Sequence, residues 1–267
     1  MLDLEAYFRR IDYAGGREPT LETLRALHLH HPLAIPFETL DALCGRPILL
    51  DLESLQKKLV GERRGGYCFE QNLLFGEVLS ALGFDVVSLA ARVLWERSDD
   101  TRARTHMLLF VQLGEGAYLC DVGFGGLTMT APLRLEPDVD QATPHEVFRV
   151  VRRGNELAVE ANLRGERKSL YRFDLQEQLR IDIEVLNYFV STHPVSPFLS
   201  SLMAAKPAID RRYGLRDRRL TVHHANGSIE QCELKSAPEL RRVLVETFGI
   251  KVPEGRDVDA ALGRLFA

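Results

Sequence analysis

The chain contains 267 residues, of which 45% are hydrophobic and 27% are charged, and its net charge is −4. This composition is typical of a globular protein with a buried core, and the length allows one large or two small domains. A slightly acidic chain is a poor match for nucleic acid or an anionic membrane, because both attract basic surfaces. We therefore expect neither as a partner.

The sequence carries no obvious targeting signal. Its N-terminus is acidic from the start, unlike a basic-then-apolar signal peptide, and no apolar run is long enough to span a bilayer. The four cysteines show no paired spacing. We expect reduced thiols in a cytoplasmic protein.

Helical periodicity dominates the first part of the chain. Four segments carry it: residues 2–10, 21–31, 52–60 and 68–82. Pro19 and Thr20 form a start signal for the second of these, and Asp51 can cap the third. The sequence thus predicts an N-terminal helical region that ends at Gly83.

Cys68 opens the last of these helices, directly after the flexible pair Gly65 and Gly66. The unpaired N–H groups and the dipole at a helix N-terminus favour a thiolate. Most free cysteines, however, are small buried hydrophobes. By itself Cys68 fits a nucleophile and a core residue equally well.

The pattern then changes to strands separated by Gly, Asp or Pro turns. These are predicted at residues 84–95, 106–113, 117–122, 147–152, 156–162 and 169–173. A helix or turn-rich connector is expected at 182–190. The remainder is predicted to form strands at 220–224 and 228–234 and helices near 238–248 and 258–266. Boundaries near residues 83 and 195 divide the chain into three segments.

His106 begins one predicted strand, and Asp121 lies near the end of the returning strand. With an even-length loop between them, Asp121 sits diagonally across from His106 on one sheet face, whereas an odd loop separates the two. Cys, His and Asp in this layout match a thiol nucleophile, its base and the group that orients the base. A core histidine and a turn aspartate are the plainer alternatives. Cys120 points to the other face and is expected to pack.

Five stretches, taken together and in order, resemble the arylamine N-acetyltransferases in their bacterial form. They are IPFETL at 35–40, RGGYCFEQN at 64–72, HM at 106–107, DVGFG at 121–125 and VSTHP at 190–194. The second stretch is the most specific. The similarity runs from about residue 5 to about residue 200.

The resemblance implies an α+β fold with a cysteine-protease-like core. Its parts are an N-terminal helical bundle (1–83) carrying the nucleophile, a central β-barrel (84–195) carrying the histidine and aspartate, and a C-terminal α/β lid (196–267). It also implies ping-pong transfer of an acetyl group from acetyl-CoA to an arylamine, hydrazine or N-hydroxyarylamine, as in xenobiotic metabolism. The catalytic residues would be Cys68, His106 and Asp121, with an acetyl-cysteine as intermediate.

The resemblance further assigns binding residues. The glycine-rich turn after Asp121 borders the acetyl-CoA cleft, with Gly125, Gly126 and Thr128 as candidate contacts. Gly126 and Thr128 stand where mammalian enzymes carry bulkier side chains, which suggests a more open acceptor pocket. Aromatic walls suit a flat amine, and the candidates are Phe37, Phe124 and Phe198. The alternative role for Phe124 is that of an ordinary core phenylalanine.

Glu38 and Arg64 are expected to form a buried structural pair that holds the Cys68 loop, the alternative being two solvated charges. No metal is expected. The histidines at 28, 30 and 31, even with Cys44, do not place three ligands on one helical face. The basic run at 211–219 is predicted to form a solvated face, or less often to meet the CoA phosphates.

Papain-like proteases and transglutaminases share the Cys-His-Asp order, so a thiol hydrolase or an amine-incorporating acyltransferase is the alternative function. A binding module with a spent site would have a damaged triad, whereas all three members are present here. The sequence is compatible with more than one acceptor amine and with either a monomer or a homodimer.

Overall fold

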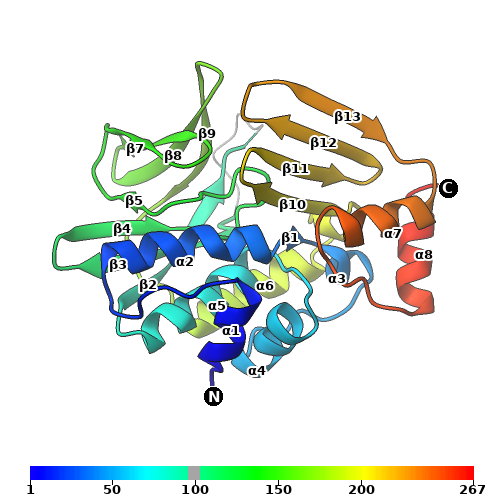
Figure 1. Ribbon diagram of the computed structural model, residues 1–267, viewed down its shortest axis with the longest axis horizontal. Coiled ribbons are helices and arrows are strands. Elements are labelled where there is room, and N and C mark those ends of the chain that lie inside the picture. The colour runs from blue at the N-terminus through cyan, green and yellow to red at the C-terminus, as the bar shows by residue number, and fades with distance from the viewer. Residues whose placement is uncertain (96–102) are drawn as a thin grey trace.

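The chain is arranged in three parts around two sheets, as a computed structural model describes for residues 1–95 and 103–267. A layer of helices from the N-terminal part lies below an eight-stranded sheet. A five-stranded sheet with two helices lies beside them and contains most of the C-terminal part (Figure 1).

The helical layer is built around α5 (Cys68–Ala81), which is buried along almost its whole length because apolar residues surround it. The other members are α1 (Leu4–Arg10), α2 (Leu21–Ala34), α3 (Leu40–Leu43), α4 (Leu52–Leu55) and the π-helix η1 (Gln56–Gly61). Thr20 accepts from the amide of Thr23 and Asp51 from that of Ser54, so both expected caps are present. The predicted helix at 52–60 continues past α4 as a π-helical turn.

The eight-stranded sheet is antiparallel throughout and curls into a nearly closed barrel. Its strands are β2 (Asp85–Val93), β3 (His106–Leu113), β4 (Gly116–Cys120), β5 (Leu133–Arg134), β6 (Asp140–Ala142), β7 (Val147–Arg153), β8 (Glu156–Leu163) and β9 (Glu166–Phe173). Side chains alternate along β3: Met107 and Leu109 pack on the helical layer, and Leu108 packs inside the barrel. The six predicted strands are all present. The short β5 and β6 lack enough residues to show a period.

The five-stranded sheet has the order β1-β10-β11-β12-β13. Its members are β1 (Phe37–Glu38), β10 (Met203–Ala208), β11 (Arg211–Arg216), β12 (Arg219–His224) and β13 (Ile229–Glu233), followed by α7 (Ala237–Glu246) and α8 (Arg256–Arg264). The last two strands and both helices were expected, whereas β10 and β11 were not. Pro207 and the arginines of this stretch are typical of a loop or a solvated face, and only pairing across the sheet gives them strand geometry.

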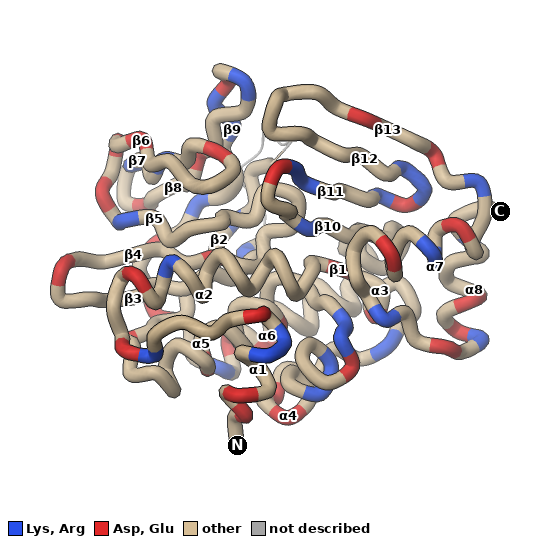
Figure 2. The backbone as a smooth tube through the Cα atoms, in the orientation of Figure 1, with Lys and Arg blue, Asp and Glu red and all other residues tan. Residues whose placement is uncertain are grey.

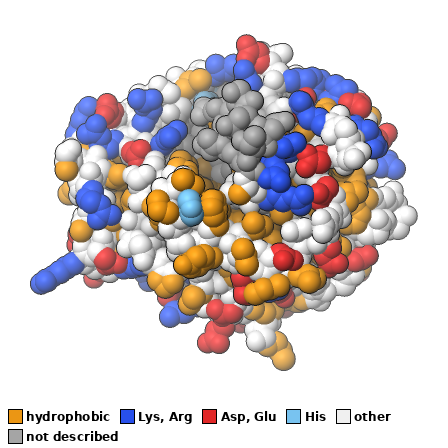
Figure 3. All heavy atoms as spheres, turned by 180° about the vertical axis from the view of Figure 1, so that it is seen from behind, with side chains coloured by type: hydrophobic (Ala, Val, Ile, Leu, Met, Phe, Trp, Pro, Cys, Tyr) orange, Lys and Arg blue, Asp and Glu red, His pale blue; other side chains and the backbone are white. Residues whose placement is uncertain are grey.

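The helix α6 (Arg180–Thr192) leads from the barrel towards the C-terminal sheet, through the short 3-10 helix η2 (Pro197–Leu199). Ile183 and Val190 pack into the same core as the helical layer. The opposite face of α6 exposes Val185 and Tyr188, and hydrophobic side chains are prominent on the side of the molecule shown in Figure 3. The boundaries at 83 and 195 stay predictions. Within the described residues, no helix is both long and apolar enough to cross a membrane.

Candidate active site

Cys68 is the first residue of α5 and lies in a buried position, with 4% of its surface exposed. The preceding amide of Tyr67 donates to the carboxylate of Glu70 at 3.0 Å, which fixes the start of the helix. A side chain at Gly123 would place its Cβ 2.7 Å from the Cα of Cys68. Only glycine therefore allows the chain after Asp121 to pass this close to the cysteine.

His106 and Asp121 are brought together by the register of β3 and β4. Leu109 pairs with Cys120 and Leu113 with Gly116, so the connecting turn has the even length that the same-face arrangement requires. His106 Nε2 lies 2.7 Å from Asp121 Oδ2, and both side chains are buried. The thiol of Cys68 lies close enough to the imidazole to affect its charge, and its Sγ lies 3.8 Å from the carbonyl oxygen of Thr105, the residue before His106.

The electrostatics favour a charged imidazole in this pair. Burial alone lowers the pKa of His106, but the charge and hydrogen bond of Asp121 outweigh it and raise that pKa to about 10. Burial raises the pKa of Asp121, and the neighbouring His106 brings it below its ordinary value. An imidazolium formed here is therefore strongly stabilised.

Asn72 connects α5 to the chain that carries Asp121. Its amide nitrogen donates to the carbonyl of Met107 at 2.8 Å and to Asp121 Oδ1 at 3.1 Å. Its amide oxygen accepts from the backbone of Val122 at 3.0 Å. Asn72 lies one helical turn after Cys68, and this spacing on one helical face is the sequence signal for such a residue.

One cleft between the barrel and the C-terminal sheet leads from the surface to the cysteine and its neighbours. Its walls include Phe37, Cys68, His106, Phe124, Gly125, Gly126 and Phe198. The ring of Phe124 meets that of His106 edge-on, with centroids 5.1 Å apart. The rings of Phe37 and Phe198 lie 6.2 Å apart. The three phenylalanines predicted for an acceptor pocket thus share one cleft with the cysteine.

Thr128 does not line this cleft. It is buried, and its hydroxyl accepts from the amide of Gly125 at 2.7 Å. Gly125 has a φ of +94°, a conformation that favours glycine, so Thr128 helps to fix the turn that Gly125 and Gly126 present to the cleft.

Basic side chains line the outer part of the cleft and come from the β8–β9 hairpin and from β11 and β12. They are Arg164, Lys168, Arg211, Arg212, Arg216 and Arg219, and Figure 2 shows basic residues at the tip of the hairpin above β9. The basic run at 211–219 was predicted to form a solvated face, and for Arg212 this prediction is wrong. It is 5% exposed and pairs with both carboxylate oxygens of Glu146, at 2.6 and 2.5 Å.

The chain is similar to known proteins over nearly its whole length. A family model described as N-acetyltransferase matches residues 20–257. An arylamine N-acetyltransferase of Mycolicibacterium smegmatis is 44% identical over 99% of this chain and 98% of its own length. The chain belongs to the arylamine N-acetyltransferase family.

Two further family members bear on the function. A Salmonella typhimurium protein named arylamine N-acetyltransferase / N-hydroxyarylamine O-acetyltransferase is 39% identical over 93% of this chain and 89% of its own. The structure of Mycobacterium marinum arylamine N-acetyltransferase in complex with CoA matches with a TM-score of 0.95 and 43% identity, over 98% of this chain and 99% of that one. The resemblance and the α+β, cysteine-protease-like fold inferred from the sequence are both confirmed.

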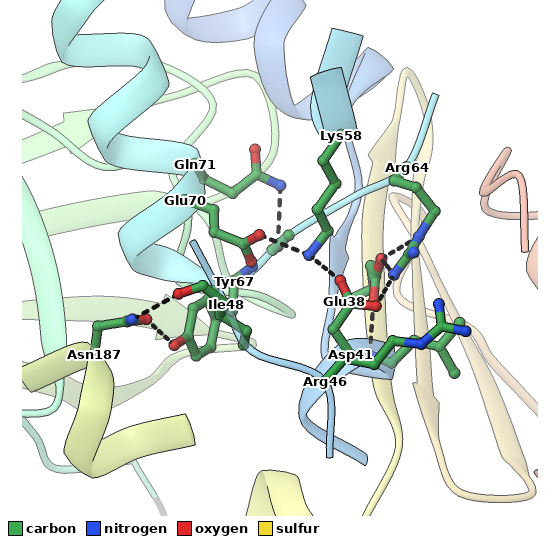
Figure 4. Close-up of polar contacts among 12 residues, drawn as sticks. Glu38, Asp41, Arg46, Ile48, Lys58, Arg64, Tyr67, Glu70, Gln71 and Asn187 are labelled. Atoms are coloured by element: carbon green, nitrogen blue, oxygen red, sulfur yellow. Dashed lines mark hydrogen bonds and ion pairs between the residues drawn. The ribbon is translucent and has the colours of Figure 1, made fainter. Parts of the chain in front are cut away.

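Two stretches that resemble the arylamine N-acetyltransferases meet in a buried cluster of charges beneath the Cys68 loop (Figure 4). Arg64 donates to Glu38 Oε1 through Nη2 at 2.6 Å and Nε at 2.9 Å, so the expected ion pair is present. Asp41, Lys58 and Glu70 also belong to this cluster, although no pattern in the sequence indicates it. Lys58 Nζ lies 2.6 Å from a carboxylate oxygen of both Asp41 and Glu70.

The two buried histidines of α2, His28 and His31, belong to the supports of this site. His28 Nε2 accepts from the backbone amide of Asp121 at 3.1 Å. His31 contacts the hydroxyl of Tyr7 and Gln71 Oε1, each at 2.7 Å. The described residues contain no group of three or more His, Cys, Asp or Glu that could hold a metal ion. His28 and His31 share the buried face of α2 with Leu24 and Leu27 at helical spacing, whereas His30 is only partly buried.

We expect these histidines to make the protein sensitive to acid. Burial lowers the pKa of His28 to about 4 and that of His31 to about 3, whereas an unfolded histidine titrates near ~6.5. The unfolded state therefore binds more protons below pH ~6.5, and stability is lost as the pH falls towards the folded pKa values. Between about pH 6 and 5 the free energy of unfolding should fall by about 1.4 kcal/mol per pH unit for each histidine.

Urea unfolding at pH 7.5, 6 and 5 measures this effect, and His31→Gln should reduce the slope because it removes one of the two groups. Tyr7→Phe is the matched control, since it removes the hydroxyl that contacts His31 but keeps the imidazole. It should lower stability at every pH and keep the slope. Equal slopes in wild type and His31→Gln would contradict the assignment.

Proposed function

We propose that the protein transfers an acetyl group from acetyl-CoA to an arylamine, hydrazine or N-hydroxyarylamine through an acetyl-cysteine on Cys68. The observation that supports this most directly is the 2.7 Å hydrogen bond between His106 Nε2 and the Asp121 carboxylate, in a cleft that His106 lines together with the Cys68 thiol. A thiol, a base and an orienting carboxylate in hydrogen-bonding contact are the requirements of nucleophilic acyl transfer. They open into a cleft with aromatic and glycine walls.

In the first half-reaction, the imidazole of His106 takes the thiol proton of Cys68. The thiolate attacks the acetyl carbonyl of acetyl-CoA and forms a carbon–sulfur bond. The intermediate then releases the CoA sulfur, which receives the proton held by His106. Asp121 stabilises the imidazolium while it holds this proton.

In the second half-reaction, the acceptor nitrogen attacks the acetyl-cysteine. His106 takes the proton of the attacking amine, the carbon–sulfur bond breaks, and the Cys68 thiolate is restored. Both Cys68 and His106 are almost completely buried, at 4% and 3% exposure. Limited access of water to the thioester favours transfer to an amine over hydrolysis.

The cleft offers different surfaces to the two substrates. Phe37, Phe124 and Phe198 supply aromatic walls for the acceptor. The basic residues of the outer cleft suit the phosphates of CoA. That CoA is a substrate is supported by the M. marinum relative, whose structure is a complex with CoA. The Salmonella relative is named as an N-hydroxyarylamine O-acetyltransferase as well, which supports N-hydroxyarylamines as acceptors here.

The cellular setting is part of the proposal. All four cysteines are free thiols, as expected in the reducing cytoplasm. We infer a cytoplasmic enzyme that acts on foreign amines, as a monomer or homodimer, without a metal.

An acetyl-enzyme should be detectable directly. With acetyl-CoA alone, intact-protein mass spectrometry should show one acetyl group that maps to Cys68 and persists over many turnover times. Addition of an aniline should discharge it, and double-reciprocal plots for the two substrates should be parallel, because the acetyl group is covalently held between them. Rapid CoA release without an amine would indicate a thiol hydrolase instead. Intersecting plots without an acetyl-enzyme would contradict the mechanism.

A further inference from the structure

The segment that carries Asp121 leaves the sheet immediately after Cys120, where β4 ends. Backbone amides that leave a ladder need new partners when they are buried. Three successive amides find them in side chains. The amide of Asp121 donates to His28 Nε2 at 3.1 Å, that of Val122 to Asn72 Oδ1 at 3.0 Å, and that of Gly123 to Asp121 Oδ1 at 3.0 Å.

The contact with His28 defines the tautomer of this histidine. An amide N–H can only donate, so Nε2 must offer its lone pair, and the proton of the neutral ring resides on Nδ1. The ring of His28 packs edge-on against Phe75, with centroids 5.7 Å apart at 88°. Both His28 and Asp121 are fully buried. The imidazole is thus held in place from the side of the helical layer.

We propose that His28 is a positioning residue: its neutral imidazole holds the backbone of Asp121 so that the carboxylate faces His106. This inference rests on the proposed function, since it assigns a role within the same reaction. Asn72 fixes the next amide and one carboxylate oxygen from α5, while His28 fixes the first amide from α2. Two helices therefore clamp the end of β4 between them.

The position of the Asp121 backbone matters because each carboxylate oxygen of Asp121 has different partners. Oδ2 faces His106, and Oδ1 accepts from Asn72 and from the amide of Gly123. Without the bond to His28, the buried amide of Asp121 has to move to find another acceptor, and the carboxylate moves with it. A displacement of about 1 Å at a catalytic group can cost about 100-fold in rate.

A pair of amide substitutions at residue 28 tests the proposal. In His28→Gln, the side-chain amide reaches the place of Nε2 and offers an oxygen to Asp121. In His28→Asn, the shorter side chain places its amide near Nδ1 and leaves the Asp121 amide without a partner. His30→Gln is the matched control, because His30 lies on the same helix but contacts the carbonyl of Ile11 at 3.0 Å, away from the cleft.

Two measurements distinguish positioning from a merely structural role. The first is kcat for acetyl transfer, with KM for acetyl-CoA. The second is the titration of His106 by NMR. The ionisable groups that face its ring are Asp121 and Cys68, together with the phenol of Tyr171, whose ring centroid lies 4.8 Å from that of His106. His28 itself faces Asp121 and His31, so its own signals are assigned separately by selective labelling.

We expect His28→Asn to lower kcat by about 100-fold with little change in KM, and to bring the His106 titration down towards the ordinary value near ~6.5. His28→Gln and His30→Gln should retain most of the rate and the raised titration. Unchanged titration and rate in His28→Asn would overturn the proposal, and so would a loss of melting temperature alone. In the wild type, ¹⁵N NMR must show Nε2 of His28 without a proton; a proton there also overturns it, whether or not the variants fold. If the wild type never acetylates Cys68, the proposed function fails, while the tautomer and titration still decide the role of His28.

Discussion

Cys68→Ala and His106→Ala are each expected to lower kcat for acetyl transfer by about 10⁴-fold or more. The thiol forms the bond to the acetyl group, and the imidazole removes its proton, so neither acts without the other. The double variant should therefore be little worse than either single one. Asp121→Asn should remain folded and lose about 10⁴-fold, since its side chain no longer stabilises the imidazolium of His106.

The measurement is single-turnover release of CoA, followed by transfer to an aniline. Cys120→Ala is the matched control, because Cys120 is a second buried cysteine that packs in the helical core beside Asp121. It should keep the rate of the wild type apart from a modest loss of stability. Near-full activity in Asp121→Asn would show that Asp121 is only a turn residue.

Arg64→Gln is expected to destabilise the protein by about 3–5 kcal/mol and to lower the melting temperature by roughly 10 °C. Glu38 is 2% exposed and relies on Arg64 for two short hydrogen bonds. Without the guanidinium, this carboxylate and that of Asp41 remain buried with Lys58 as the nearest cation, and Lys58 already contacts Asp41 and Glu70. Soluble yield should fall as well.

Arg63→Gln provides a control one residue away. The side chain of Arg63 is exposed, and in the described part of the chain no ion pair involves it. Its replacement should change the melting temperature little. The double variant Glu38→Gln, Arg64→Gln should be more stable than Arg64→Gln alone, because it leaves no stranded charge at residue 38. A melt of Arg64→Gln within error of the wild type would show that the pair contributes nothing.

The sequence predicts two parts of the candidate site because their geometry is local. Cys68 opens a helix whose apolar pattern is plain. The contact of His106 with Asp121 follows from the parity of one hairpin, in which a single extra residue in the turn would have separated them. The roles of these residues remain a proposal, whereas the family and fold class inferred from the same stretches are established.

Features that depend on distant partners were not predicted. The arginines of β11 look solvated in sequence, but Arg212 is buried against Glu146, which lies in the turn just before β7. Lys58 looks like one of several surface lysines, and only the fold brings two carboxylates to it. His28 lies on a helix with two other histidines, and nothing in its own neighbourhood indicates that it reaches Asp121. Charge and helical period reveal burial poorly when a buried charge is paired.

The short strand β1 has a consequence for the order in which the molecule can assemble. Phe37 pairs with Ala205 of β10 and bridges to Gly66 in the loop before Cys68. A nascent chain can form the helices α1, α2 and α5 early, since the backbone hydrogen bonds within a helix are local. The pairing with β10 has to wait until the C-terminal sheet has been synthesised, and contacts between such distant segments form slowly. The wall of the cleft at Phe37 is therefore completed late, and an unfinished chain on the ribosome holds its cysteine in a helix without a finished pocket around it.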